Sequence, residues 1–181
     1  MRPRPIARVA RALALTALAA LLASAPVRSA SKAGGAPDGV AATIDLDAAS
    51  AVDPGTGDRI PVLTGGTIYH VVFFATWCPP CVDEIPLLAD LHERWEEDGY
   101  ALVLVAISNR QDRERVSEFA FQARVPGRVV FDEKDVLRNL LDVERIPTHL
   151  LIDRRGRVLL RTAGFEGRIA EIVGEEIRRT R

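Results

Sequence analysis

The sequence contains very little cysteine, which excludes several classes of small protein. Two cysteines among 181 residues form at most one disulfide, so the chain is not a disulfide-stapled scaffold. They also cannot supply a four-thiolate zinc cage, or the paired cysteines and paired histidines of a zinc finger. The 11 prolines are scattered and 48% of the residues are hydrophobic. This composition excludes collagen-like and disordered chains and indicates one packed globular domain with an appendage.

The sequence also lacks an apolar run of the ~20 residues that a membrane-spanning helix needs. Its longest apolar run is ALALTALAALLA at 12–23, and residues 1–30 contain five arginines and no acidic residue. A basic start followed by such a run predicts a secretory signal peptide within 1–30. The small residues at 23–25 are a candidate cleavage motif, although Pro26 follows them. The alternatives are an uncleaved N-terminal anchor and an amphipathic helix of a cytosolic protein.

Beyond residue 30 the chain is acidic, with 19 basic against 25 acidic residues and a net charge of −6. It has no basic run, and nucleic-acid affinity depends mainly on neutralising phosphates, so we expect no binding to nucleic acid. Residues 31–37 (SKAGGAP) have the composition of a flexible linker. We therefore expect a domain at 38–181 that is exported to the periplasm, with membrane tethering by an uncleaved signal as the alternative.

Hydrophobic patterning over 38–181 alternates between short apolar runs typical of buried strands and the helical period. The clearest strand is YHVVFFA at 69–75, because an almost continuous apolar run is expected of a strand buried on both faces. Asp112 is a candidate N-cap for the helix that follows it. The alternation predicts an α/β fold: a mixed central sheet with helices on both faces and an N-terminal β extension. The predicted strands are 43–46, 60–63, 69–75, 102–107, 129–131, 149–153 and 158–162, and the predicted helices are 81–97, 113–124, 134–141 and 168–179.

Cys78 and Cys81 form a C-x-x-C pair at the turn between the apolar strand and the helix after it. At a helix start, unsatisfied N–H groups and the helix dipole favour a thiolate, which predicts Cys78 as an exposed nucleophile. Cys81 lies one turn later, within disulfide reach, and can attack a mixed disulfide on Cys78 as the resolving cysteine. Pro79 and Pro80 suit the first helical positions and remove N–H donors near Cys78, which favours a reducing potential.

Other interpretations of the cysteine pair remain open. The thiols could be buried and inert, or they could form a purely structural disulfide. Two thiolates and an imidazole would also suit Cu(I), with His149 as the third ligand of a copper carrier. We interpret His149 otherwise as a structural histidine, and His70 and His92 have no companion motif. Trp77 flanks the first cysteine, and both a packing role and substrate contact are compatible with its position.

Two separated motifs carry a family resemblance. The first runs from Trp77 to Pro86 as W-C-P-P-C-x-x-E-x-P, and the second runs from Ile146 to Gly156 as I-P-T-x-x-x-I-D-x-x-G. Together, in this order around alternating strands and helices, they resemble the TlpA/ResA-like branch of the thioredoxin superfamily over about 71–164. The resemblance implies a thioredoxin-like fold and the activity of an extracytoplasmic thiol-disulfide oxidoreductase.

The resemblance also implies roles for individual residues and partners. Ile146-Pro147 would be a cis peptide bond that faces the two sulfurs and supports substrate binding; the alternative is a trans proline at the start of a strand. The dithiol would reduce disulfides of partner proteins, for example an apocytochrome during cytochrome c maturation or a copper-site protein. Its electrons would come from a membrane thiol carrier. No cofactor is required, and we expect a monomer.

The sequence departs from the family pattern at two positions. Relatives usually carry Asn or Asp where Val72 stands, so another group must move protons. Thr148 stands where cytochrome c maturation members often have Glu, which argues against membership of that subgroup. Glu84, one helical turn after Cys81, is the remaining candidate to accept a proton from Cys81 or to raise the pKa of the cysteines by its charge. The alternative for Glu84 is a first-turn acid that only complements the helix dipole.

Overall fold

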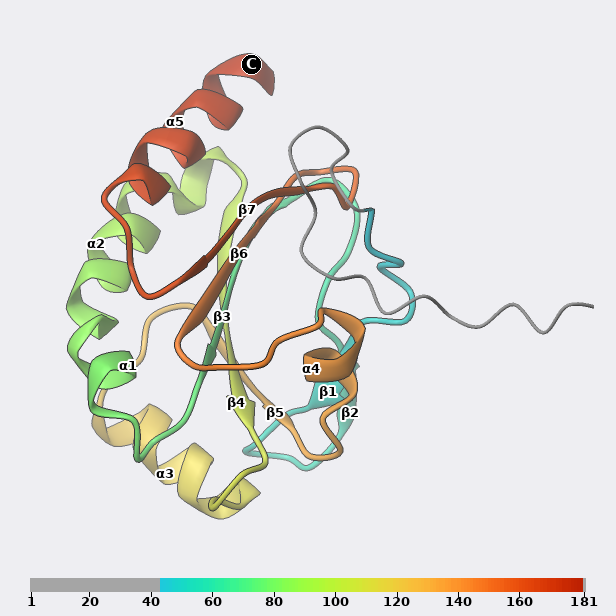
Figure 1. Cartoon of the computed structure of the whole chain (residues 1–181), viewed down its shortest axis with the longest axis vertical. Coiled ribbons are helices and arrows are strands. Elements are labelled where there is room, and N and C mark those ends of the chain that lie inside the picture. The colour runs from blue at the N-terminus through green and yellow to red at the C-terminus, as the bar shows by residue number, and fades with distance from the viewer. Residues whose placement is uncertain (1–42, 181) are drawn as a thin grey trace, which may run out of the picture. The chain divides into compact units, whose positions relative to one another are not determined.

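The computed structural model describes residues 43–180, which Figure 1 shows in colour. The predicted signal peptide at 1–30, the linker at 31–37 and the first residues of the predicted domain lie outside the described residues. Strands and helices alternate over 68–140, and the chain closes with a hairpin and a helix. No helix within 43–180 combines the length and the apolarity that crossing a membrane requires.

The domain is built on one mixed sheet of seven strands: β1 (Ser50–Val52), β2 (Arg59–Pro61), β3 (Ile68–Phe74), β4 (Tyr100–Ile107), β5 (Arg128–Asp132), β6 (Thr148–Ile152) and β7 (Val158–Ala163). Their order in the sheet is β2-β1-β5-β4-β3-β6-β7. β3, β4 and β5 are parallel, whereas β6 and β7 form an antiparallel hairpin beside β3. β1 and β2 add an antiparallel pair at the far edge. This confirms the predicted mixed sheet with an N-terminal β extension.

β3 lies inside the sheet because it is apolar on both of its faces. All seven of its residues are buried, including the polar His70, and β4 beside it has only one residue that is not buried. β3 pairs with β4 on one side and with β6 on the other. The end of β3 is therefore a fixed point in the core, and the residues that follow it are held in place by two neighbouring strands.

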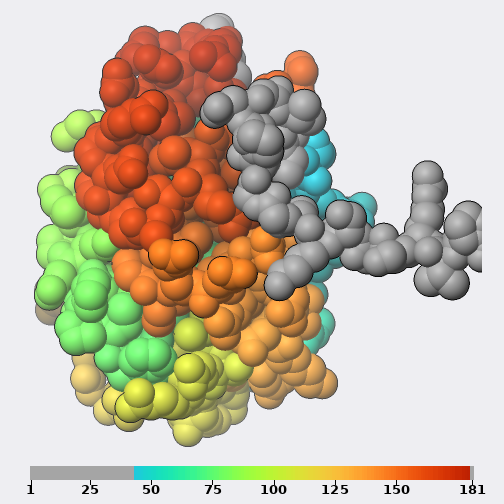
Figure 2. Space-filling view, viewed as in Figure 1, coloured from blue at the N-terminus to red at the C-terminus, as the bar shows by residue number. Residues whose placement is uncertain are grey.

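Helices cover both faces of the sheet, as predicted. They are α1 (Pro79–Asp83), α2 (Ile85–Trp95), the 3-10 helix η1 (Glu96–Asp98), α3 (Arg113–Gln122), α4 (Val136–Leu140) and α5 (Arg168–Thr180). The crossovers from β3 to β4 and from β4 to β5 step in the same direction, so right-handed connections put α1, α2 and α3 on one face. α5 lies beside α2 on that face, and α4 lies on the opposite face (Figure 1). In the space-filling view, the green surface of α1 and α2 adjoins the red surface of α5 (Figure 2).

The N-terminal part of the described chain differs from the prediction. Residues 44–46 are not in a strand, and Thr43 makes only an isolated bridge with Arg157. The strand that forms instead is β1, which pairs with β2 at 59–61, where a strand was predicted at 60–63. The patterning missed β1 because this three-residue strand contains a single β-branched residue, and its position depends on pairing with β2.

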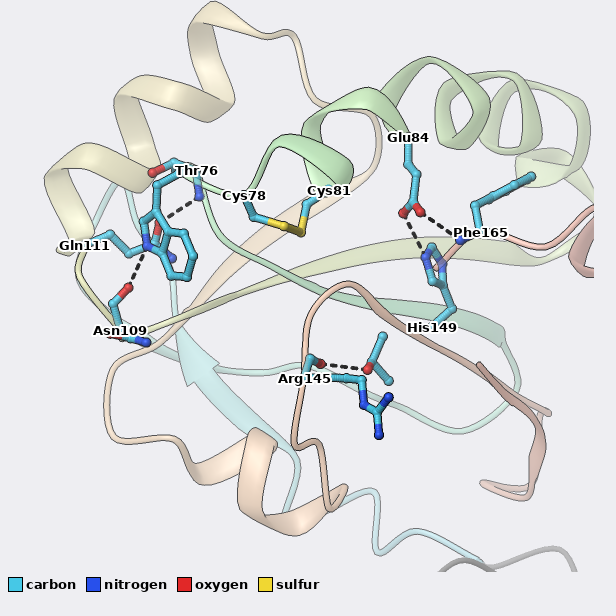
Figure 3. The surroundings of a disulfide bond; sticks show 11 residues. Thr76, Cys78, Cys81, Glu84, Asn109, Gln111, Arg145, His149 and Phe165 are labelled. Atoms are coloured by element: carbon cyan, nitrogen blue, oxygen red, sulfur yellow. Dashed lines mark hydrogen bonds and ion pairs between the residues drawn. A yellow bond between two sulfur atoms is a disulfide. The ribbon is translucent and has the colours of Figure 1, made fainter. Parts of the chain in front are cut away.

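The predicted helix at 81–97 is wrong in one respect, because the structure interrupts it at Glu84. Glu84 follows α1 and is the N-cap of α2. An unbroken helix would need the N–H of residue 86 to reach the carbonyl of Val82, and Pro86 has no N–H and clashes there. The Glu84 side chain makes no capping hydrogen bond to α2. It points toward the sheet instead (Figure 3).

The remaining predicted elements are confirmed, with ends displaced by one or two residues. Asp112 is the N-cap of α3, and its side chain accepts a hydrogen bond from the N–H of Arg115 at 2.9 Å. The hairpin of β6 and β7 turns at 153–157, where Gly156 adopts a φ of +82° that suits glycine. These elements place the C-x-x-C turn, the loop before β6 and the loop after β7 around one end of the sheet.

Candidate active site

Cys78 and Cys81 form a disulfide just beyond the end of β3, with 2.09 Å between the sulfur atoms and 5.3 Å between the Cα atoms. Cys78 is the N-cap of α1 and has extended backbone angles, and Cys81 lies within α1. The predicted position of the pair at a strand-to-helix turn is therefore confirmed. Cys78 is less accessible than predicted, with 6% of its surface exposed against 3% for Cys81. The disulfide turns its sulfur toward the first turn of α1, and both cysteines pack against the apolar core.

Pro79 and Pro80 occupy the first two positions of α1, as predicted. An N-cap side chain accepts its hydrogen bond from the N–H of the second or third helical residue. Pro80 removes the donor at the second position, so the N–H of Cys81 is the one capping donor that remains for Cys78. In the disulfide form the Cys78 side chain makes no capping hydrogen bond.

Two hydrogen bonds and a cation–π contact connect the turn before Cys78 to the loop that follows β4. The indole Nε1–H of Trp77 donates to the carbonyl of Asn109 at 2.8 Å, and the Arg110 guanidinium lies 4.9 Å from the centre of the Trp77 ring. The backbone N–H of Thr76 donates to Oε1 of Gln111 at 2.9 Å (Figure 3). These contacts fix the rim of the disulfide turn, and the sequence contained no motif that linked residues 109–111 to the cysteines.

The Ile146–Pro147 peptide bond is cis, as the family resemblance implies. It lies directly before β6, which pairs with β3, and this pairing brings the loop to the end of the sheet that carries the disulfide (Figure 3). The hydroxyl of Thr148 donates to the carbonyl of Arg145 at 2.7 Å. The N–H of Gly164 donates to the carbonyl of Pro147 at 3.0 Å, which attaches the loop after β7 to the same place.

Glu84 lies one turn beyond the disulfide, and both of its carboxylate oxygens have protein donors. Oε1 accepts a hydrogen bond from the backbone N–H of Phe165 at 2.7 Å, and Oε2 lies 2.9 Å from Nε2 of His149 (Figure 3). The side chain of Glu84 is 13% exposed, whereas that of His149 is 1% exposed. The break between α1 and α2 therefore places a carboxylate against two elements from the C-terminal half of the chain.

A chain of hydrogen bonds continues from His149 into the core. Nδ1 of His149 lies 3.0 Å from Nε2 of His70 on β3, and Nδ1 of His70 lies 2.8 Å from the hydroxyl of Tyr100 on β4. Burial, together with the neighbouring His149, lowers the pKa of His70 to about 3. Burial also lowers the pKa of His149, although Glu84 acts in the opposite direction. Burial raises the pKa of Tyr100. Both histidines are therefore neutral at pH 7.

The hydrogen bonds of His149 argue against its use as the third ligand of a Cu(I) site with the two cysteines. Both of its ring nitrogens are engaged, one by Glu84 and one by His70, so neither offers a lone pair beside the cysteines without loss of a buried hydrogen bond. Within the described part of the chain, no group of three or more His, Cys, Asp or Glu side chains is arranged to hold a metal ion. No sequence motif indicated a role for His70, Tyr100 or Phe165. The one signal was a histidine at the second position of the otherwise apolar run YHVVFFA.

Comparison with models of protein families shows the family to which the chain belongs. The model of the Redoxin family matches residues 26–173, and the chain belongs to this family. It is 30% identical over 86 residues to the thiol-disulfide oxidoreductase ResA of Geobacillus thermodenitrificans, which covers 48% of each chain. It is also 30% identical over 105 residues to sporulation thiol-disulfide oxidoreductase A of Bacillus subtilis, covering 56% of this chain and 62% of the relative. The chain thus spans about half to three fifths of the length of these relatives.

A solved structure extends the likeness over more of the chain. The crystal structure of StoA from Bacillus subtilis has a TM-score of 0.58 and 25% identity, and the match covers 69% of this chain and 92% of StoA. The fold is thioredoxin-like, and the relatives bear the names of thiol-disulfide oxidoreductases. The resemblance drawn from the two sequence motifs is therefore confirmed.

Proposed function

We propose that this protein is an extracytoplasmic thiol-disulfide oxidoreductase that reduces disulfides of partner proteins. The observation that carries the proposal is the disulfide between Cys78, at the N-cap of a helix, and Cys81, one turn later, at the end of a buried strand. A loop of three residues contributes little chain-entropy stabilisation, so a purely structural role would explain this disulfide poorly. Family membership and the names of the relatives support the proposal.

The reaction consists of two thiol-disulfide exchanges. The Cys78 thiolate attacks one sulfur of a substrate disulfide; a bond forms between Cys78 and the substrate, and the other substrate sulfur leaves as a thiolate. Cys81 then gives its proton to Glu84, and its sulfur attacks the sulfur of Cys78. The Cys78–Cys81 bond forms, the second substrate sulfur leaves, and the proton on Glu84 passes to a departing thiolate. Two electrons move from the protein dithiol to the substrate, so the dithiol is oxidised and the substrate disulfide is reduced.

Five residues beside the cysteines and in the loop before β6 form the surroundings of the reacting sulfurs: Trp77, Pro79, Pro80, Ile146 and Pro147. The loop before β6 reaches the disulfide end of the sheet and offers backbone groups to an extended substrate segment beside Cys78. A trapped substrate would lie between this loop and the rim formed by Trp77. The substrate class that suits such a surface is an exposed protein disulfide, as the resemblance to reductases of apocytochromes and copper-site proteins also suggests.

The cycle needs a dithiol donor, because each turnover leaves Cys78 and Cys81 oxidised. A membrane thiol carrier with a surface-exposed dithiol would reduce them by the reverse exchange. The basic and apolar segment at 1–30 supports export to the periplasm, where such a carrier and its substrates would meet the domain. The mechanism requires no cofactor.

Trapping of the mixed disulfide tests the proposal. The reduced protein is mixed with insulin as a model disulfide substrate, and free thiols and mixed disulfides are measured after acid quenching. We expect the unaltered protein to reduce insulin, and Cys81→Ser to accumulate an insulin adduct through Cys78 that dithiothreitol cleaves. Cys78→Ser is the matched control and should form no adduct. If Cys78→Ser forms the adduct instead, the roles are reversed, and if neither variant does, the proposed activity is wrong.

A further inference from the structure

The two oxygens of Glu84 are held by donors of different kinds. The donor to Oε1 is a backbone N–H, which remains a donor in any protonation state of nearby side chains. The donor to Oε2 is the imidazole of His149, a side chain that is buried on β6 and belongs to a different part of the sequence. A carboxylate on the break between two helices would otherwise have several rotamers available. The imidazole therefore restricts which way the carboxylate faces.

The protons in the chain from Tyr100 to Glu84 can be assigned from the donor inventory. An ionised carboxylate only accepts, so Nε2 of His149 carries a proton and donates to Glu84. Neutral His149 then accepts at Nδ1, so Nε2 of His70 is the donor between the two rings. Neutral His70 accepts at Nδ1, and the hydroxyl of Tyr100 donates to it. All three donors thus point toward the Glu84 carboxylate.

The opposite orientation of these bonds is less favourable because of Tyr100. If every proton were reversed, His70 would donate to the Tyr100 oxygen, and the Tyr100 hydroxyl would need another acceptor. Among residues 43–180, His70 is the one hydrogen-bond partner of that hydroxyl. A buried hydroxyl without an acceptor is costly, so Tyr100 selects the orientation in which His149 donates to Glu84.

We infer that His149 is the positioning residue for Glu84, and that His70 and Tyr100 hold His149 in the tautomer whose Nε2–H donates to the carboxylate. This inference rests on the proposed function, in which Glu84 accepts the proton of Cys81. His149 touches neither sulfur nor substrate in that scheme. It acts by holding the Glu84 carboxylate in one orientation until Cys81 releases its proton.

The sheet register explains why these residues meet. On β3, His70 and Val72 lie on the same face, and Val72 pairs with His149 on β6. The two histidines therefore share one face of the sheet, under the break between α1 and α2. Other charged groups lie on the elements packed against this face. They include His92 on α2, whose ring centre lies 6.4 Å from that of Tyr100, and Glu96, which pairs with His92 at 3.2 Å. They also include Glu176, which is buried on α5, and Glu166, which accepts a hydrogen bond from Thr162, the β7 residue that pairs with His149.

The first test measures the rate at which the Cys78 mixed disulfide is resolved, as a function of pH. His149→Gln keeps a side-chain N–H donor, and His149→Val removes it while preserving a residue that suits a strand. We expect His149→Gln to retain the profile of the unaltered protein. In His149→Val the pH at which the resolution rate is half-maximal, the midpoint of the profile, should rise by about one pH unit. The reason is that the carboxylate of Glu84 loses a charge-assisted hydrogen bond. His92→Gln is the matched control and should leave the midpoint unchanged.

The effect of His149 is expected to depend on Glu84, so variants of the two residues are tested in combination. In a Glu84→Gln background, the change of His149 to Val should shift the midpoint no further. An unchanged midpoint in His149→Val, with insulin reduction and the Cys81→Ser adduct intact, would overturn the inference and leave the proposed function standing. Loss of the adduct in Cys81→Ser would instead overturn the proposed function.

A second test needs no variant in the chain of hydrogen bonds and therefore does not depend on variant folding. The ¹⁵N chemical shifts of the imidazole nitrogens are recorded on the unaltered full chain at pH 7, with His92→Gln used to assign the third histidine. We expect neutral rings in His70 and His149, each with the proton on Nε2. An imidazolium at His149, or a proton on its Nδ1, would contradict the assignment and overturn the inference.

Discussion

Nε2 of His70 lies 3.0 Å from Nδ1 of His149, so two imidazole rings share one hydrogen bond inside the sheet. Both residues are almost completely buried, at 0% and 1% exposure. Protonation of His70 would put a charge into the core with no carboxylate from residues 43–180 in contact with the ring, whereas protonation of His149 would be opposed by burial and favoured by Glu84. Folding therefore favours the neutral form of both histidines.

This pair should make the fold sensitive to mild acid. The pKa of His70 falls to about 3 in the folded protein from 6.5 when unfolded, so between these values the unfolded chain binds more protons. The stability from the neutral ring is fully present above pH 6.5 and is lost as the pH falls toward 3. His70 alone should lower the free energy of unfolding by up to about 1.4 kcal/mol per pH unit.

The measurement is urea unfolding between pH 4 and pH 7. We expect the slope of the free energy of unfolding against pH to be shallower in His70→Gln than in the unaltered protein, because one titrating group has been removed. His92→Gln is the control and should keep the original slope. Parallel pH dependences in all three proteins would show that His70 does not titrate differently in the two states.

Gly127 lies before β5 with a φ of +70°, and a Cβ atom there would collide with the carbonyl oxygen of Leu102 on β4. Gly127→Ala should therefore lower the free energy of unfolding by at least about 2 kcal/mol, since it adds a left-handed conformational cost to a backbone clash. A Cβ at Gly167 would meet nothing within 4 Å, so Gly167→Ala should change stability by less than about 0.5 kcal/mol. Thermal unfolding of the two variants distinguishes them, and equal melting temperatures would contradict the prediction.

The inner strands and the cysteine turn could be predicted because their signals are local. YHVVFFA is an almost continuous apolar run, and the C-x-x-C motif is defined by its own spacing. The Asp112 cap is also a local feature, since its side chain bonds to a residue three positions later. The break at Glu84 had a local cause as well, namely Pro86, but helical spacing of the apolar residues outweighed it in the prediction.

The hydrogen-bond chain could not be predicted because it depends on pairing between distant segments. Its three links join residues that are 65, 79 and 30 positions apart. A histidine inside an apolar run is ambiguous until its partner is known. The family resemblance implied that the polar group usual at the position of Val72 is replaced by another group. The structure places His149 opposite Val72 on the next strand, and this relationship is visible only in the sheet register.

Export can be tested on the full chain in a bacterial host. The segment at 1–30 has the layout of a signal peptide, so we expect the protein in the periplasmic fraction or attached to the periplasmic face of the inner membrane. A variant that starts at residue 31 should remain in the cytosol. Recovery of the full chain only from the cytosol would refute export and favour the amphipathic-helix interpretation.

Pro80 should hold the reduction potential of the disulfide low. It occupies the second position of α1, where a backbone N–H would donate to the side chain of the N-cap residue Cys78. Pro80→Ala restores this donor and stabilises the reduced, thiolate form, and a protein whose reduced form is stabilised is a stronger oxidant. One hydrogen bond to a charged group contributes about 1.5 kcal/mol, which corresponds to a rise of about 30 mV.

Pro79→Ala is the matched control for this prediction, because both variants lose one proline and gain one N–H. The N–H at the first helical position is not the one that caps the N-cap side chain, so Pro79→Ala should change the potential much less. The potentials are measured by equilibration with glutathione buffers and alkylation of free thiols. Equal shifts in the two variants would mean that proline acts through the stiffness of the turn, because a capping effect requires the N–H at position 80 specifically.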